Sequence, residues 1–284
     1  MMSDTLIAEK PVVSAAEAAL ERRYREPLAG ADHPWNAVIQ SLVDHRTVRA
    51  FLPKAVSEET LQVLVAAAQS APTSSNVQAW SVVAVRDPAR KARLAHLAGD
   101  QKHILEAPLL LVWIADLSRA AGIGERAGLT LEGLDFTESF LIAGFDAALA
   151  AQNALVAAES LGLGTCYIGA LRNHPIEVAE TLGLPRKTFA VFGLVVGHPD
   201  PARPADVKPR LPQAAVLHHE TYDLAGQAEA VARHDAHSLA FRAEQKLDAT
   251  PWSQQLIGRL HTVAALKGRH LLKQALEKLG FALK

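Results

Sequence analysis

Residues 140–161 read FLIAGFDAALAAQNALVAAESL, and this stretch predicts a helix that is apolar around nearly its whole circumference. Alanine and leucine favour the helix, and Gly162 and Gly164 end it. A helix that is apolar on every side must be buried. To bury about six turns on every face, one small domain would need protein on both sides. A subunit interface supplies the second side economically, so we predict a homodimer built on this helix.

Three short stretches on either side of this helix predict strands. Residues 81–85 follow a helical stretch at 61–70 and a polar loop at 73–76. Residues 109–115 (LLLVWIA) and 189–197 (FAVFGLVVG) are apolar on both alternating faces, as in a strand that is covered on both sides. We therefore expect a sheet that is buried on both faces.

The two ends of the chain predict further helices. Ser14 and Glu17 have the spacing of a capping box, so residues 15–25 are expected to form a charged helix appended to the surface. After a proline-rich stretch, residues 229–246 and 253–281 are amphipathic and predict a helical C-terminal arm rather than a second domain. Within that arm we interpret the apolar residues that recur at helical spacing as a packing stripe: Leu256, Leu260 and Val263.

The composition excludes several classes of protein. With 284 residues, 49% of them apolar, and a formal net charge of -1, the chain is expected to be a soluble folded protein without an overall field that attracts nucleic acid or an anionic membrane. The single cysteine, Cys166, cannot form an intramolecular disulfide, which favours a reducing compartment, by default the cytoplasm. Residues 1–30 lack the apolar core of a secretion signal, and we expect no segment with the roughly 20 apolar residues of a membrane span.

The common hydrolase, zinc and nucleotide motifs are absent from the sequence. It contains no H-E-x-x-H, no G-x-S-x-G, no P-loop and no G-x-G-x-x-G after a strand. His234 and His237 share a helix face, and His218 and His219 are adjacent, but neither pair has a third ligand at a recognisable spacing. We interpret all four as solvated surface histidines and predict no metal site.

Two basic segments offer groups that bind anions. Residues 45–49 (HRTVR) place cations and a hydroxyl within five positions, a compact set of donors for a phosphate, although such a set is also typical of an ordinary basic turn. Lys208 and Arg210 flank Pro209, which stiffens the backbone between two cations. Taken alone, that second segment is equally typical of a plain surface.

Two uncharged segments are suited to a polar, flat ligand. Residues 72–78 (PTSSNVQ) carry hydroxyl and amide groups at a helix end, and residues 167–170 (YIGA) let a ligand approach the main chain closely. An ordinary loop and a tight turn explain these two segments about as well.

Taken together and in this order, these segments resemble the FMN-dependent nitroreductase family, in its oxygen-insensitive nitroreductase and NADPH-flavin oxidoreductase branch. The resemblance extends from Val43 to the C-terminus and rests on HRTVRAF, SAPTSSNVQ, GDQKHI, AAESLGLGTCYIGALRN, FGLVVGHP, KPRLP and TPWS. It implies an α+β fold, with a central, mostly antiparallel sheet flanked by helices, in an intertwined homodimer with two FMN sites at the interface. We divide the chain into an N-terminal extension at 1–34, an FMN-binding core at 35–200 and a C-terminal arm at 201–284 that belongs to the same domain.

The resemblance also assigns ligands to FMN. His45, Arg46, Thr47 and Arg49 would hold the phosphate and ribityl chain, with Arg210 also at the phosphate. Groups that would hydrogen-bond the ribityl chain or the ring edge are Thr73, Ser74, Ser75, Asn76 and Gln101, with Ser74 and Ser75 reaching from the partner subunit. Tyr167, Ile168 and Gly169 would lie along one flavin face. Lys208 would lie near the pyrimidine ring, where a fixed ammonium stabilises the negative charge of the reduced flavin.

The implied activity is a ping-pong transfer of hydride from NADPH or NADH to FMN and then to a nitroaromatic, quinone, free flavin, chromate or azo dye. NADPH is the preferred donor, with Arg242 as the candidate contact of its 2'-phosphate. Asp100, Ala170 and Thr47 depart from residues common in the family, but all three leave the flavin assignment intact. The alternatives are another FMN reaction on the same fold, such as reductive dehalogenation or flavin fragmentation, and a non-catalytic flavin-binding redox module.

Overall fold

The computed structural model describes residues 14–28 and 33–284, which form two compact units. The first unit consists of the described residues up to His45 together with Val207–Gln255. The second consists of Arg46–Asp206 and Leu256–Lys284. These boundaries group the chain differently from the division at residues 34 and 200, because the N-terminal segment folds together with part of the arm.

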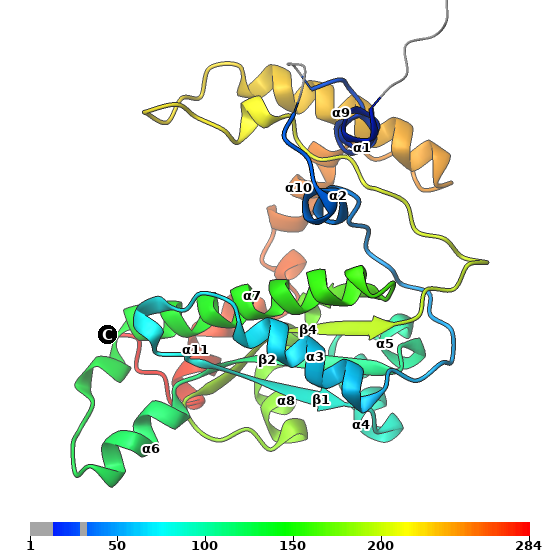
Figure 1. The fold of residues 1–284 in the computed structure, drawn as a ribbon. Coiled ribbons are helices and arrows are strands. Elements are labelled where there is room, and N and C mark those ends of the chain that lie inside the picture. The colour runs from blue at the N-terminus through cyan, green and yellow to red at the C-terminus, as the bar shows by residue number, and fades with distance from the viewer. Residues whose placement is uncertain (1–13, 29–32) are drawn as a thin grey trace, which may run out of the picture. The chain divides into compact units, whose positions relative to one another are not determined.

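The second unit contains a sheet of four antiparallel strands in the order β1-β2-β4-β3 (Figure 1). The strands are β1 (Trp80–Val85), β2 (Leu109–Asp116), β4 (Thr188–Gly197) and β3 (Gly164–Ile168). The first three confirm the predicted strands within one residue at each end. The fourth strand was not predicted from the sequence, which suggested a turn near its end.

Helices cover both faces of this sheet, as predicted. Along β2, Leu109, Leu111 and Trp113 pack against α3 (Glu58–Gln69) and α7 (Thr137–Ser160). The alternate side chains enter a second core cluster: Leu110, Val112 and Ile114. That cluster also contains residues of α4 (Pro88–Leu97), α5 (Lys102–Glu106) and α8 (Pro175–Leu182). Every residue of β2 is buried, as expected of a strand at the centre of a three-layer unit.

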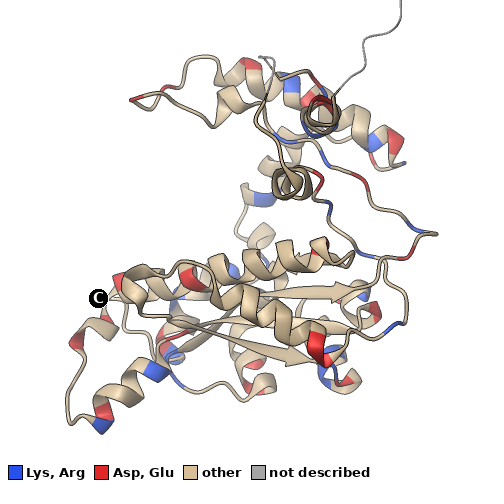
Figure 2. Ribbon diagram, in the orientation of Figure 1, with Lys and Arg blue, Asp and Glu red and all other residues tan. Residues whose placement is uncertain are grey.

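The long apolar helix is α7, but one chain does not bury it on every side. Its inner face is buried, whereas Leu141, Phe145 and Leu149 are 41%, 61% and 44% exposed. α7 is also long and apolar enough to cross a membrane by length and composition alone. Its packing on α3 and the sheet is that of a core helix in a soluble protein, and Figure 2 shows few charges along it.

The first unit contains α1 (Ala15–Tyr24), α2 (Ala37–Val43) and α9 (Gln227–Glu244). The capping box of α1 is confirmed: the Ser14 hydroxyl accepts from the Glu17 amide at 3.2 Å, and the Glu17 carboxylate accepts from the Ser14 amide at 2.7 Å. α1 exposes Glu17, Glu21 and Arg22, as expected of a charged surface helix, and buries its other face through Ala16, Ala19, Leu20 and Arg23.

The C-terminal stretch at 253–281 is broken rather than continuous. It forms α10 (Trp252–Leu260), two short 3-10 turns (Ala264–Leu266 and Arg269–Leu271) and α11 (Leu272–Lys278). The break coincides with positive φ at Lys267 and Gly268, which a helix cannot contain. The predicted packing stripe is wrong for a single chain, because Leu256, Leu260 and Val263 are 42%, 63% and 60% exposed. The remaining elements are α6 (Ser118–Arg126) and the 3-10 turns Ser74–Asn76, Glu132–Asp135, Gly169–Asn173 and Gln213–Ala215.

Candidate functional site

The segment 46–49 runs beside β3 in the second unit. Thr47 forms an isolated parallel bridge with Thr165, and the Val48 amide donates to the Thr165 carbonyl at 2.8 Å. Val48 is buried, whereas Arg46 and Arg49 are exposed. Anchoring on β3 therefore keeps the backbone of this segment in place and leaves its two arginines at the surface, where an anion can reach them.

Arg49 lies next to the partly buried His103 and the buried Cys166. The His103 Nε2 and the Cys166 Sγ are 3.9 Å apart. Burial and the nearby Arg49 cation both lower the pKa of His103. Burial raises the pKa of the Cys166 thiol, and the charge of Arg49 together with a hydrogen bond from it opposes that rise. The guanidinium of Arg49 is thus located at β3, close to the segment that carries Tyr167.

The polar loop 73–78 adopts a strained backbone. Ser75, Asn76 and Gln78 have φ values of 49°, 55° and 52°, a region that side chains other than glycine rarely occupy. The carboxylate of Asp146 accepts from the amides of Ser74 and Ala79, both at 3.0 Å, and so holds the two ends of the loop. Asp146 is 1% exposed. The sequence analysis overlooked it, although it is the single charged residue between positions 139 and 158.

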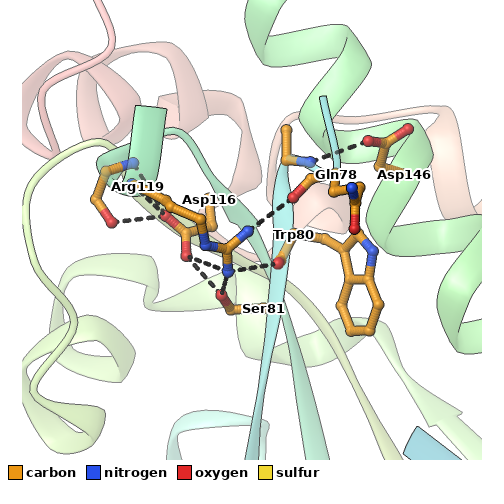
Figure 3. A network of polar contacts seen from close by, with 8 residues as sticks. Gln78, Trp80, Ser81, Asp116, Arg119 and Asp146 are labelled. Carbon is orange, nitrogen blue, oxygen red and sulfur yellow. Dashed lines mark hydrogen bonds and ion pairs between the residues drawn. The ribbon is translucent and has the colours of Figure 1, made fainter. Parts of the chain in front are cut away.

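A second polar network holds the chain just after this loop (Figure 3). Arg119 donates to the carbonyls of Gln78 at 2.8 Å and Trp80 at 3.2 Å. Asp116 accepts from the Ser81 hydroxyl at 2.5 Å. Burial alone would raise the pKa of Asp116, but its hydrogen bonds from Ser118 and Ser81 and the charge of Arg119 lower it. An open cavity of about 860 Å³ is lined by part of the loop, including Thr73 and Asn76, and by Trp80, Ser81 and Arg119.

The end of β3 supplies one exposed ring and two main-chain positions. The Tyr167 ring lies edge-on to Phe192, with centroids 5.0 Å apart, and its hydroxyl donates to Gln152 at 3.4 Å. The side chain of Ile168 is buried, so only its main chain is available to a ligand. A Cβ on Gly169 would lie 3.3 Å from the guanidinium of Arg172, a close contact that this side chain would have to relieve by a small shift.

Gln101 belongs to a tight loop of its own. Its side-chain amide donates to the Ala98 carbonyl at 2.9 Å. The preceding Asp100 has φ of 57°, and its carboxylate is hydrogen-bonded to His96 Nδ1 at 3.0 Å. In this structure the Gln101 side chain therefore serves its own loop, and its role toward a cofactor stays a prediction.

The second basic segment, 208–210, lies in the first unit. Pro209 is buried, while Lys208 and Arg210 on either side of it are exposed. Arg23 of α1 donates to the Lys208 carbonyl at 2.7 Å and accepts from the Arg210 amide at 3.1 Å. The same guanidinium donates to the His45 carbonyl at 2.5 Å. Two of the residues assigned to FMN, His45 and Lys208, are thus brought together by a residue that the sequence analysis did not single out.

The α9 helix contributes a buried histidine beside this segment. His234 is 3% exposed, packs edge-on against Trp252 at 5.3 Å and hydrogen-bonds the main chain of Arg210. Burial lowers its pKa. The prediction of a solvated histidine is wrong for His234, because the periodicity of a helix does not say which of its faces is covered. The Nδ1 atom of His237 is buried as well.

A cavity of about 350 Å³ opens between these elements of the first unit. Its lining combines cations with aromatic rings, notably Lys208, Arg210, His234, Arg242 and Trp252. Arg242 donates to the Asp248 carbonyl at 2.7 Å and to the Gln255 side chain at 3.3 Å, and it also pairs with the Asp248 carboxylate. These contacts fix the guanidinium at the rim of a positively charged hollow.

The chemistry of the donors fits a phosphorylated cofactor such as FMN. Each unit presents exposed cations on an anchored backbone, and the second adds the hydroxyls and amides of loop 73–78. Among residues 14–28 and 33–284, no group of three or more His, Cys, Asp or Glu side chains could hold a metal ion. Cations and neutral donors without a carboxylate cluster suit a phosphate rather than a divalent cation.

The fold and these donors define an α+β protein built to hold an anionic cofactor. The description "Nitroreductase family" matches residues 42–198, and "Nitroreductase family, C-terminal domain" matches residues 208–284. The chain belongs to the nitroreductase family, which confirms the resemblance and the expected fold class.

Several relatives are similar over most of their length. A Bacillus subtilis protein named FMN reductase (NADPH) is 44% identical over 190 residues, which are 66% of this chain and 76% of the relative. The NADPH-flavin oxidoreductase of Vibrio harveyi is 36% identical over 249 residues, covering 84% of this chain and 100% of the relative. The solved structure of NfrA2 from B. megaterium has a TM-score of 0.82 at 38% identity and is covered completely by 88% of this chain.

Proposed function

We propose that this chain is an NAD(P)H-dependent FMN oxidoreductase of the nitroreductase type. The observation that carries the proposal is that both basic segments lie on anchored backbone with their cations exposed, in a chain similar to proteins named FMN reductase and NADPH-flavin oxidoreductase. When bound, FMN would supply the two-electron redox chemistry between a nicotinamide nucleotide and an acceptor. The protein's own residues would bind the cofactor, orient its ring and adjust how readily it is reduced.

Each group of residues has a distinct task in this proposal. In the second unit, Arg46, Thr47 and Arg49 hold the phosphate and ribityl chain, and loop 73–76 with Gln101 hydrogen-bonds the polar edge of FMN. Tyr167, Ile168 and Gly169 lie along one flavin face, where Gly169 keeps the main chain accessible. In the first unit, His45 and Arg210 bind the phosphate. The ammonium of Lys208 stabilises the negative charge that reduction adds to the flavin.

The donor is NADPH, and the acceptor is a flat, electron-poor molecule such as free flavin, a quinone or a nitroaromatic. Arg242 supports the choice of donor, because it lines a hollow that already contains two other cations, Lys208 and Arg210. A guanidinium held at a cavity rim is suited to the extra phosphate that distinguishes NADPH from NADH. Two of the relatives carry NADPH in their names, which also supports NADPH as the donor.

The active form in this proposal is a cytoplasmic homodimer. Leu141, Phe145 and Leu149 recur every four residues on α7 and form an exposed apolar stripe on a single chain. A second copy of the helix would cover the stripe, as an isologous interface requires. Cys166 is buried as a free thiol, which is consistent with a reducing compartment.

The visible spectrum of the purified protein tests the proposal. Oxidised flavin should give a band at roughly 450 nm that NADPH bleaches under anaerobic conditions and a quinone or nitroarene restores. NADH should bleach the band more slowly at equal concentration. A colourless protein that FMN cannot load would overturn the cofactor assignment, while a coloured protein that neither nucleotide reduces would overturn the activity.

A further inference from the structure

The N-terminal helix α1 comes from a part of the chain that lies outside both family matches, which begin at residue 42. The full length of NfrA2 is covered by 88% of this chain, so part of this chain has no counterpart there. We propose that α1 is a positioning element of the FMN site, and that Arg23 acts through the backbone of His45 and Lys208. This inference rests on the proposed function.

The guanidinium of Arg23 bridges two segments that are far apart in sequence. Its Nε and Nη2 donate to the Val43 carbonyl at 3.0 and 2.7 Å, and Nη2 also donates to the His45 carbonyl. Its Nη1 donates to the Lys208 carbonyl at 2.7 Å. Because one planar group reaches all three carbonyls, it fixes the separation between the backbone of Val43 and His45 and that of Lys208.

The contact with the second segment is two-sided. The Arg23 carbonyl accepts from the Arg210 amide at 3.1 Å, so the side chain and main chain of one residue hold the segment before and after Pro209. His234 adds a hydrogen bond to the main chain of Arg210 from α9. With the backbone held at these points and Pro209 buried, the Lys208 and Arg210 side chains project from a rigid base.

Neighbouring arginines attach α1 to the rest of the first unit. Arg22 pairs with Asp44 at 2.9 Å, directly ahead of His45. Arg25 forms a two-pronged pair with Glu244 of α9 at 2.7 and 2.8 Å and stacks over Phe241 at 5.6 Å. Unlike these partly exposed pairs, Arg23 is 6% exposed. Loss of its side chain would leave three carbonyls without this donor in a place that water reaches poorly.

Binding is tighter when the cofactor site already has its bound shape, because less of the binding free energy is lost in ordering the protein. Arg23 therefore acts as a positioning residue: it touches backbone, and its effect should appear in the affinity for FMN. Replacement by Gln removes the planar guanidinium and its charge, and so releases the backbone of His45 and Lys208. We expect the dissociation constant of FMN to rise about tenfold or more, the equivalent of about 1.4 kcal/mol.

The experiment compares full-length apoproteins by quenching of FMN fluorescence. Arg23→Gln is the test and Arg22→Gln the matched control, since Arg22 is the adjacent arginine of the same helix and its ion pair is solvent-exposed. The control should stay within about twofold of the wild type. Hydrogen exchange in the apoproteins should be faster in peptides covering residues 207–211 for Arg23→Gln alone.

The outcomes separate the two proposals. Wild-type protein that fails to quench FMN would overturn the proposed function. Equal FMN affinity of the wild type and Arg23→Gln, at a temperature where both are folded, would overturn this inference alone. A lower melting temperature of Arg23→Gln with an unchanged dissociation constant for FMN would do the same. If Arg23→Gln does not fold, Arg23→Lys keeps the stem and charge but not the fork, and unchanged FMN affinity in that variant would likewise contradict the inference.

Discussion

The buried carboxylate of Asp146 should be a main stabilising element of the candidate site. Its two oxygens accept from the amides of Ser74 and Ala79, each at 3.0 Å, and it is 1% exposed. Both bonds are charge-assisted, and such bonds contribute about 1.5–3 kcal/mol each. Ser74 is exposed, so water can replace its partner, whereas the Ala79 amide is buried and has no such replacement.

We therefore expect Asp146→Ala to lower the free energy of unfolding by about 3 kcal/mol and Asp146→Asn by about 2 kcal/mol. The asparagine keeps one acceptor oxygen but turns an NH2 group toward the second amide. FMN affinity should fall in both variants, because loop 73–76 would no longer be held in its strained conformation.

Urea unfolding of the apoproteins at one fixed protein concentration measures the difference. Glu138→Gln is the control, because Glu138 is an exposed carboxylate on the same helix and its loss should cost less than about 1 kcal/mol. If Asp146→Ala were no less stable than this control, the account of Asp146 as the anchor of the loop would be refuted.

Four further predictions address the chemistry, the donor, the interface and the pH response. Lys208→Ala should slow flavin reduction about tenfold or more in stopped-flow mixing while the protein stays folded, and an unchanged rate would remove Lys208 from the proposed role. Arg242→Ala should raise KM for NADPH several-fold but leave KM for NADH unchanged, whereas equal effects on both would contradict a contact with the 2'-phosphate. Phe145→Asp should be more monomeric than the wild type in sedimentation equilibrium, because it places a charge in the apolar stripe of α7. A wild-type protein that is monomeric when loaded with FMN would exclude this interface. Burial lowers the pKa of His103 and His234 below the ordinary 6.5, so their contribution to stability is complete above pH 6.5 and is lost as the pH falls below it. Urea midpoints should therefore fall between pH 7.5 and 5.5, and His103→Gln should reduce that change; a slope equal to that of the wild type would show that His103 does not contribute.

The sequence alone was sufficient for three of the four strands of the second unit and for its helices α3 and α7. Strand residues 109–115 and 189–197 could be predicted because a strand buried on both faces is a short apolar run, and that pattern is local. The capping box at Ser14 and the helix that follows it depend on residues three positions apart. The family followed from ordered motifs, each read within a few residues. All these features require only short-range information.

Only the tertiary structure decided which faces are covered and which distant groups meet. The local patterns predicted α1 and α9 but did not show that Arg23 is buried, they assigned His234 to solvent, and they assigned Leu260 to a packing stripe that one chain leaves exposed. The bond from Arg23 to Lys208 spans 185 positions, and the bond from Asp146 to Ser74 spans 72. A helix pattern fixes which residues share a face, but the partner of that face is chosen by packing between segments remote in the chain, which no local pattern encodes.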